Sequence, residues 1–211
     1  MTGASHPGWT PMPTTETKPR IALLGGTFDP VHLGHVHLFH EAHAVAGISR
    51  LIVIPVFISN FKRGTHPASF AERAEMLCLA ICDYRDIYPE DRMEVEISLY
   101  EGEKGGVSYT SETIRAFYDE AADRGKVNFI IGDDLVASLG SWHDIAYLRS
   151  HVRFICFTRL GDAVENTSGA EVIFIRSDVF HASSSEVRAG EKGMLSPRVR
   201  KFVDENKLYG A

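Results

Sequence analysis

The stretch from Ile21 to His35 constrains the fold of this chain more than any other segment. It begins with four apolar residues, Ile21 to Leu24, which predict a short buried strand. Gly25-Gly26 follows, where the backbone must turn or approach another group closely. Asp29-Pro30 then favours an extended or turn conformation. A strand, a glycine turn and the start of a helix are therefore expected in close succession.

Phosphate binding is the chemistry that this stretch favours. A strand that ends in glycines and leads into a helix leaves free N–H groups and the positive end of the helix dipole. His32 and His35 lie at or beside the predicted helix start, where both imidazoles can lean toward its N-terminal end. The stretch matches neither GxGxxG nor GxxxxGK[ST], which argues against a dehydrogenase-type site and a P-loop. An ordinary turn with two capping histidines is the alternative.

Composition restricts the class of protein. The chain has 211 residues, of which 44% are hydrophobic and 24% charged, and this suits one globular α/β domain. A net charge of −6 argues against general binding to nucleic acid or to an anionic membrane. Three cysteines do not make a disulfide framework. Because neither a run of 18 apolar residues nor a signal peptide is evident, a cytoplasmic location is expected.

Strands and helices alternate along the chain after a proline-rich beginning. Residues 1–19 are expected to form a flexible N-terminal tail, and 20–211 a single domain. The alternation predicts one doubly wound, mostly parallel sheet, with 93–97 at an edge. Right-handed crossovers would then align the helix N-termini along one edge of the sheet. Further strands are predicted at 51–55, 93–97, 127–131, 152–157 and 172–175.

A second phosphate-binding element is predicted at Ala182 to Arg188. Ser183 and Glu186 have the spacing of a helix capping box. That cap does not account for three consecutive serines followed by Arg188 in the first turns of the helix. Hydroxyls, a helix N-terminus and a guanidinium together suit a triphosphate.

Two carboxylates mark the end of the predicted strand at 127–131. Asp133 and Asp134 stand where open α/β sheets bind ligands, and they could accept from ribose hydroxyls or hold Mg²⁺ through water. An aspartate N-cap is the alternative. Trp142 follows, either in the core or as a stacking surface for an aromatic ligand.

Three local predictions concern the middle of the chain. Gly102 to Gly106 is expected to be a turn, and Ser108-Tyr109-Thr110-Ser111 to start a helix with a hydroxyl cap. Arg73 lies near a predicted helix N-terminus, where its charge opposes the dipole. A specific anionic partner would explain Arg73, with a solvated side chain as the alternative.

The segment GGTFDPVHLGH resembles the signature of the HxGH nucleotidyltransferase superfamily. Within it, the chain resembles bacterial nicotinate-nucleotide adenylyltransferases from about Ile21 to Tyr209. Phe129 to Asp134, with Trp142 downstream, is similar to the family's GxD…W segment, and Ala182 to Arg188 to its SSTxIR. The resemblance implies a Rossmann-like fold and transfer of AMP from ATP to nicotinate mononucleotide, giving deamido-NAD and pyrophosphate in NAD biosynthesis.

The resemblance also implies roles for individual residues. It implies that Mg²⁺ acts together with ATP, the co-substrate, and that a pyridine mononucleotide is the acceptor. No protein ligand to a metal is expected, and neither nucleic acid nor a membrane is expected as a partner. A homo-oligomer is possible. The implied catalytic residues are His32, His35 and Lys62; the ATP-binding residues are Gly25, Gly26, Thr27, Phe28, Ser184, Ser185 and Arg188; and the mononucleotide-binding residues are Ser108, Tyr109, Thr110, Asp134 and Trp142.

The chain departs from the family after its second strand. The family commonly shows Asn residues and a Pro-Pro-His-Lys-like stretch, whereas Val56 and Phe57 occupy the Asn positions here and Phe61 the His position. Lys62 can stand for the basic residue. This departure bears on the acceptor more than on adenylyl transfer. The alternatives are a sister adenylyltransferase that acts on nicotinamide mononucleotide or phosphopantetheine, and a non-catalytic nucleotide sensor.

Overall fold

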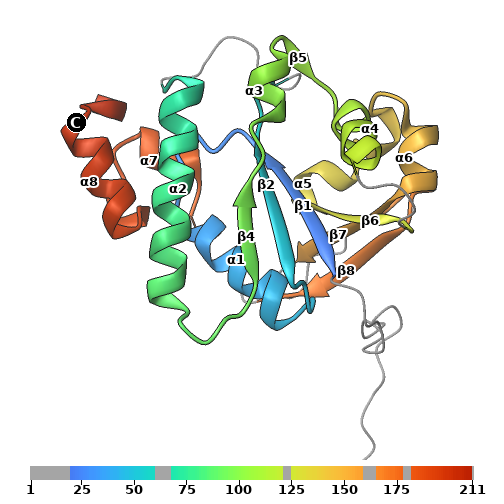
Figure 1. The fold of residues 1–211 in the computed structure, drawn as a ribbon, viewed down its shortest axis with the longest axis horizontal. Coiled ribbons are helices and arrows are strands. Elements are labelled where there is room, and N and C mark those ends of the chain that lie inside the picture. Colours follow the sequence, from blue (N-terminus) through green and yellow to red (C-terminus); the bar gives the residue numbers. More distant parts are fainter. Residues whose placement is uncertain (1–19, 60–67, 121–124, 159–164, 178–181, 211) are drawn as a thin grey trace, which may run out of the picture.

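The computed structural model places a central sheet between two layers of helices (Figure 1). The predicted tail and Lys62 lie outside the part of the chain that the structure describes. No helix in that part is both long and apolar enough to cross a lipid bilayer. The described residues are 20–59, 68–120, 125–158, 165–177 and 182–210.

Six parallel strands form the main sheet in the order β4-β2-β1-β6-β7-β8. The strand order reverses between β1 and β6, which is the position where doubly wound sheets bind ligands. The predicted sheet is confirmed, and β4 lies at its edge as expected. The strands are β1 (Ile21–Gly26), β2 (Arg50–Pro55), β4 (Glu94–Ile97), β6 (Val127–Ile131), β7 (Val152–Thr158) and β8 (Val172–Arg176).

A small second sheet lies beside the first. It pairs β3 (Ile58–Ser59) with β5 (Val107–Ser108), and strands of two residues are too short to show a sequence pattern. Ser108 therefore ends a strand, and α4 begins only at Thr110. The predicted turn at Gly102 to Gly106 is wrong in its first half, because α3 spans Tyr100–Lys104 and only the last two glycines turn.

Helices cover both faces of the main sheet, and the alternation of side chains along each strand creates two cores. In β1, Ala22 and Leu24 point to one core, while Ile21 and Leu23 point to the other. The first face carries α1 (Leu33–Ala44), α2 (Phe70–Ile87), α7 (Ser184–Arg188) and α8 (Pro197–Glu205). The second carries α4 (Thr110–Glu120), α5 (Asp133–Val136), η1 (Leu139–Ser141) and α6 (Ile145–His151). Two further turns are η2 (Lys192–Met194) and η3 (Leu208–Gly210).

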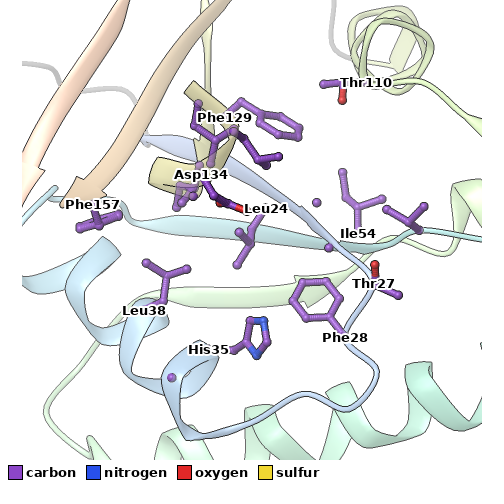
Figure 2. Close-up of a pocket in the computed structure, with 18 of the residues that line it drawn as sticks. Leu24, Thr27, Phe28, His35, Leu38, Ile54, Thr110, Phe129, Asp134 and Phe157 are labelled. Carbon is purple, nitrogen blue, oxygen red and sulfur yellow. The ribbon is translucent and has the colours of Figure 1, made fainter. Parts of the chain in front are cut away.

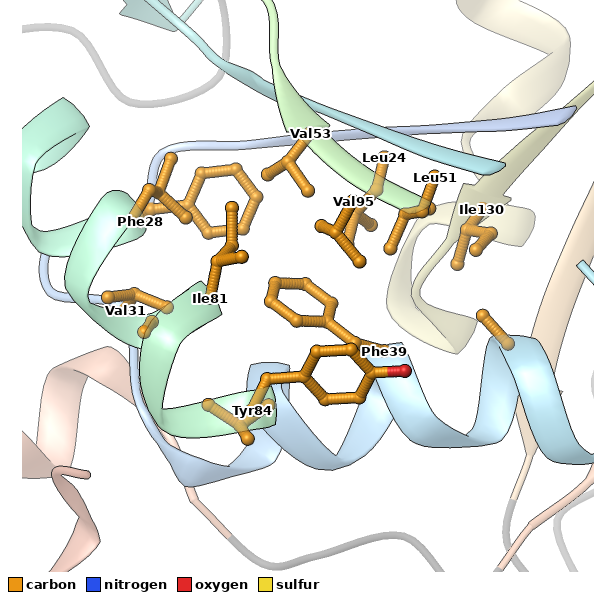
Figure 3. Close-up of a cluster of buried hydrophobic side chains, with 14 of the residues drawn as sticks. Leu24, Phe28, Val31, Phe39, Leu51, Val53, Ile81, Tyr84, Val95 and Ile130 are labelled. Carbon is orange, nitrogen blue, oxygen red and sulfur yellow. The ribbon is translucent and has the colours of Figure 1, made fainter. Parts of the chain in front are cut away.

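The larger core holds α1 and α2 against the sheet (Figure 3). Phe39 of α1 and Tyr84 of α2 meet edge to face, with ring centroids 5.8 Å apart, beneath Leu51 and Val53 of β2. Each fully buried side chain of this size contributes roughly 2–3 kcal/mol of burial free energy. This packing fixes the direction of α1, and with it the position of the two histidines at its start.

Candidate active site

A cavity of about 440 Å³ opens where the strand order reverses (Figure 2). It lies at the carboxyl ends of β1 and β6, so the glycines of the first turn and the aspartates after β6 line the same space. Figure 2 shows His35 and Phe28 on one side of the cavity and Thr110 on the other, with Leu24 and Ile54 between them. Elements from the beginning, middle and end of the chain therefore converge here.

The two histidines begin α1 side by side. His32 is the N-cap residue, and its backbone N–H donates to Nδ1 of His35 at 3.2 Å. His35 lines the cavity directly, whereas His32 lies behind it and is only 7% exposed. Burial lowers the pKa of His32 from 6.5 to about 4, against an opposing effect of Glu186. His32 is therefore neutral at pH 7.

Two glycines leave room for the aromatic rings beside the cavity. A Cβ on Gly34 would stand 3.0 Å from Nδ1 of His32 and 3.4 Å from Cβ of Ala182, so a side chain there would press on both. A Cβ on Gly26 would meet the ring of Phe28 at 2.8 Å. Gly25, Gly26, Thr27 and Phe28 all line the cavity, as the predicted nucleotide-contacting turn requires.

Arg73 of α2 has three carbonyl partners, and the charge of Asp29 also acts on it. Its side chain is 1% exposed and donates to the carbonyl oxygens of Thr27 at 2.7 Å, Val56 at 2.8 Å and Phe57 at 3.3 Å. Burial lowers its pKa, and the charge of Asp29 opposes that shift. Arg73 therefore ties the turn after β1 to the segment after β2.

The serines and Arg188 of α7 approach the same turn. Ser183 caps α7, because its Oγ accepts from the backbone N–H of Glu186 at 3.2 Å. The Glu186 carboxylate accepts from Oγ of Ser183 at 2.6 Å, so the structure shows the predicted N-cap but not the reciprocal bond of a capping box. Ser184 lines the cavity and donates to the Pro30 carbonyl at 2.9 Å. Arg188 donates to the Asp29 carbonyl and to Oγ of Ser185. Ser185 and Arg188 lie beside the cavity rather than in its lining.

The residues predicted for the mononucleotide divide into two groups. Ser108 and Thr110 line the cavity, but Tyr109 stacks on His143, with ring centroids 4.4 Å apart. Trp142 lines the cavity and packs edge to face on Phe154, which confirms its place in the core. Its use as a stacking surface for an aromatic ligand stays a prediction.

The aspartates after β6 face the cavity as well. Asp133 and Asp134 both belong to its lining. The N-cap of α5 is Gly132, so the alternative of an aspartate N-cap is wrong.

Sequence reasoning missed two buried carboxylates in the cavity wall, Glu41 of α1 and Glu101 of α3. Glu101 of α3 is 5% exposed and accepts a hydrogen bond from Oγ1 of Thr113 at 2.8 Å. Thr113 lies one helical turn after Thr110, so Glu101 belongs to the same side of the cavity. No motif marks Glu101, which directly precedes the segment predicted as a turn.

Comparisons with known proteins agree with this geometry. A family model described as Cytidylyltransferase-like matches residues 23–190. A Listeria innocua protein named "Probable nicotinate-nucleotide adenylyltransferase" is 33% identical over 92% of this chain and 98% of its own length. The nicotinate-nucleotide adenylyltransferase of Bacillus subtilis is 30% identical over 90% of this chain and 98% of its own length.

A solved structure shares the fold. The Plasmodium falciparum nicotinic acid mononucleotide adenylyltransferase complexed with NaAD has a TM-score of 0.73 to this chain at 19% identity. The match covers 91% of this chain and 98% of that one. A cavity at the β1/β6 switch point, an HxGH pair at its edge and two near full-length relatives lead to one conclusion: the chain belongs to the nicotinate-nucleotide adenylyltransferases of the cytidylyltransferase-like family.

Proposed function

We propose that this chain transfers AMP from ATP to nicotinate mononucleotide, producing deamido-NAD and pyrophosphate in NAD biosynthesis. One observation carries the proposal. One cavity is lined by His35 and Ser184, which suit phosphate groups, and by Thr110 and Trp142, which suit a pyridine ring with its carboxylate. Membership of the adenylyltransferase family supports the same reaction.

The chemistry needs no protein nucleophile. An oxygen of the mononucleotide phosphate attacks the α-phosphorus of ATP in line, the new P–O bond forms, and the bond to pyrophosphate breaks. The protein holds two polyanions together and stabilises the charge that develops between them. We assign His35 to the reacting phosphates because it lines the cavity, and neutral His32 to the same centre from behind it.

The nucleotide side would be formed by backbone and hydroxyl groups. Gly25, Gly26 and Thr27 admit the nucleotide, and Ser184 presents a hydroxyl at the start of α7. In this proposal Ser185 and Arg188 reach the β- and γ-phosphates from beside the cavity, and Lys62 adds a further cation.

A divalent ion would enter with the substrate. No group of three or more His, Cys, Asp or Glu side chains that could hold a metal occurs among the described residues. We therefore propose that Mg²⁺ is bound by the phosphate oxygens of ATP and by water, which suits an ion that prefers octahedral oxygen ligands. Its contribution would be to neutralise charge on the triphosphate.

The acceptor side of the cavity would bind the pyridine ring of the mononucleotide. Trp142 offers an aromatic surface to the ring, and the N-terminus of α4 at Thr110 favours a negative group such as the nicotinate carboxylate. Ser108 and Tyr109 complete this side in the proposal. Asp134 would accept hydrogen bonds from ribose hydroxyls.

The test is pyrophosphate release with Mg²⁺-ATP, varying only the acceptor among nicotinate mononucleotide, nicotinamide mononucleotide and phosphopantetheine. Strong preference for nicotinate mononucleotide is expected. Preference for either other acceptor would keep the chemistry and replace the substrate. ATP binding without turnover of any acceptor would favour a nucleotide sensor and overturn the proposal.

A further inference from the structure

The turn η3, near the end of the chain, reaches back to the loop between β1 and α1. Oη of Tyr209 donates a hydrogen bond to Oδ1 of Asp29 at 2.7 Å. Asp29 is 2% exposed and Tyr209 is half-buried, so this bond is partly shielded from water. Burial and the bond to Asp29 raise the pKa of the Tyr209 phenol well above its usual range, so the phenol keeps its proton. The two residues are 180 positions apart in the sequence.

The backbone at both ends of this contact is in a disfavoured conformation. Tyr209 has φ 57° and ψ 39°, in the left-handed region that residues with a Cβ avoid. Phe28, next to Asp29, has φ 49°. Such conformations persist where the surrounding structure over-determines them, and they cluster at functional sites. The Tyr209–Asp29 hydrogen bond is one of the contacts that hold them.

The backbone around Asp29 also holds the nucleotide side of the cavity. The carbonyl of Asp29 accepts from Arg188, and the carbonyl of Pro30 accepts from Ser184. His32, the N-cap of α1, follows two residues after Pro30. A shift of Asp29 would therefore move Ser184 and Arg188 together with the approach to the histidines.

We propose that Tyr209 is a positioning residue for the ATP half of the reaction, acting through Asp29. The proposal rests on the adenylyl-transfer function above. The acceptor side depends on other elements: Thr110 begins α4 and Trp142 follows η1, and both elements pack in the core on the opposite face of the sheet from Tyr209. Loss of the Tyr209 hydroxyl is therefore expected to weaken ATP binding and to leave acceptor binding unchanged.

The experiment compares Tyr209→Phe with Tyr84→Phe in the full chain. Tyr84 is a matched control, since it donates to Oδ2 of Asp91 at the same distance of 2.7 Å, and Asp91 lies outside the loop between β1 and α1. Tyr209→Phe is expected to raise the KM for ATP about 5- to 10-fold and leave the KM for the acceptor within about 2-fold. A merely structural loss would lower the active fraction and leave both KM values in place. That outcome would overturn the proposal.

A second readout removes the dependence on the acceptor. Titration calorimetry of ATP binding without any acceptor is expected to show the same weakening for Tyr209→Phe and none for Tyr84→Phe. Failure of the adenylyl-transfer function would appear in the wild-type protein as absent turnover, whereas failure of this inference would appear as equal ATP affinities in wild type and Tyr209→Phe.

A mutant cycle then tests the route through Asp29. In an Asp29→Ala background, Tyr209→Phe is expected to have no further effect on ATP affinity, because the shared bond is already lost. Independent, additive effects would show that Tyr209 does not act through Asp29. The conservative Asp29→Asn variant keeps an acceptor oxygen and is expected to retain most of the response to Tyr209→Phe.

Discussion

The rings of His32 and His35 lie against each other at the start of α1, with centroids 3.8 Å apart and the ring planes tilted by 36°. The backbone N–H of His32 donates to Nδ1 of His35. Because Nδ1 accepts this bond, the neutral imidazole of His35 carries its hydrogen on Nε2. The N-cap of the helix therefore sets the tautomer in which Nε2 is a donor, and the proposed function directs this donor at a phosphoryl oxygen.

The first prediction concerns that donor. His35→Ala should lower kcat by about 10²-fold or more if His35 stabilises the transition state. His43→Ala is the control, since His43 lies on the same helix and bonds the carbonyl of Ile48 away from the cavity. The rates are measured as pyrophosphate release at saturating ATP and acceptor. An unchanged rate for His35→Ala would remove His35 from the mechanism.

The fold follows from patterns that are local in sequence. Buried runs such as Leu51 to Pro55 and capping boxes such as Ser69 with Glu72 predict strands and helix starts, and the structure places β2 and α2 there. Right-handed crossovers predict that helix N-termini lie along one edge of the sheet, but they do not fix the order of the strands, which only the structure gives. Periodicity and caps thus sufficed for the strands of the main sheet, but not for the two-residue strands β3 and β5.

Residues of the candidate site could be predicted only where they belong to a recognisable sequence motif. The HxGH and serine-rich segments identify the residues around His35 and Ser184, but not their connections. Arg73 reaches Thr27 across 46 positions, and Tyr209 reaches Asp29 across 180. Such pairs depend on how the helices pack, which local sequence patterns do not show. Glu101 was not predicted for the same reason.

A second prediction concerns the room beside His32. Gly34→Ala should raise the intrinsic preference for helix by about 1 kcal/mol, because Gly34 lies inside α1. The added Cβ would press on the His32 ring at 3.0 Å, however, so the ring must shift. We expect kcat to fall about 10-fold while the free energy of unfolding changes by less than about 1 kcal/mol.

Gly193→Ala is the matched control for this change. A Cβ on Gly193 meets nothing within 4 Å, and the residue lies in η2 away from the cavity. Its kcat should equal that of the wild type. A fall in kcat in both variants, or in neither, would contradict the role given to the space beside His32.

A third prediction concerns the buried guanidinium of Arg73. Arg73→Met should lower the free energy of unfolding by about 3–5 kcal/mol, because the Thr27, Val56 and Phe57 carbonyls lose a charged donor inside the protein. Arg85→Met, on the exposed side of the same helix, should change it by less than about 0.5 kcal/mol. Urea unfolding measures both, and equal stabilities of the two variants would show that Arg73 does not hold the loops.

The fourth prediction is a pH dependence that originates at His32. Its pKa is about 4 in the folded protein and near 6.5 in the unfolded chain, because burial disfavours the charged imidazole. Between these two values the unfolded chain binds the extra proton and the folded protein does not. The contribution of His32 to stability is therefore fully present above pH 6.5 and is lost as the pH falls toward 4, by about 3 kcal/mol. Urea unfolding of wild type and His32→Gln between pH 4 and 7.5 isolates this effect, because the other titrating groups cancel in the difference. Wild type should lose stability relative to His32→Gln as the pH falls, and parallel curves would show that His32 is not buried in its neutral form.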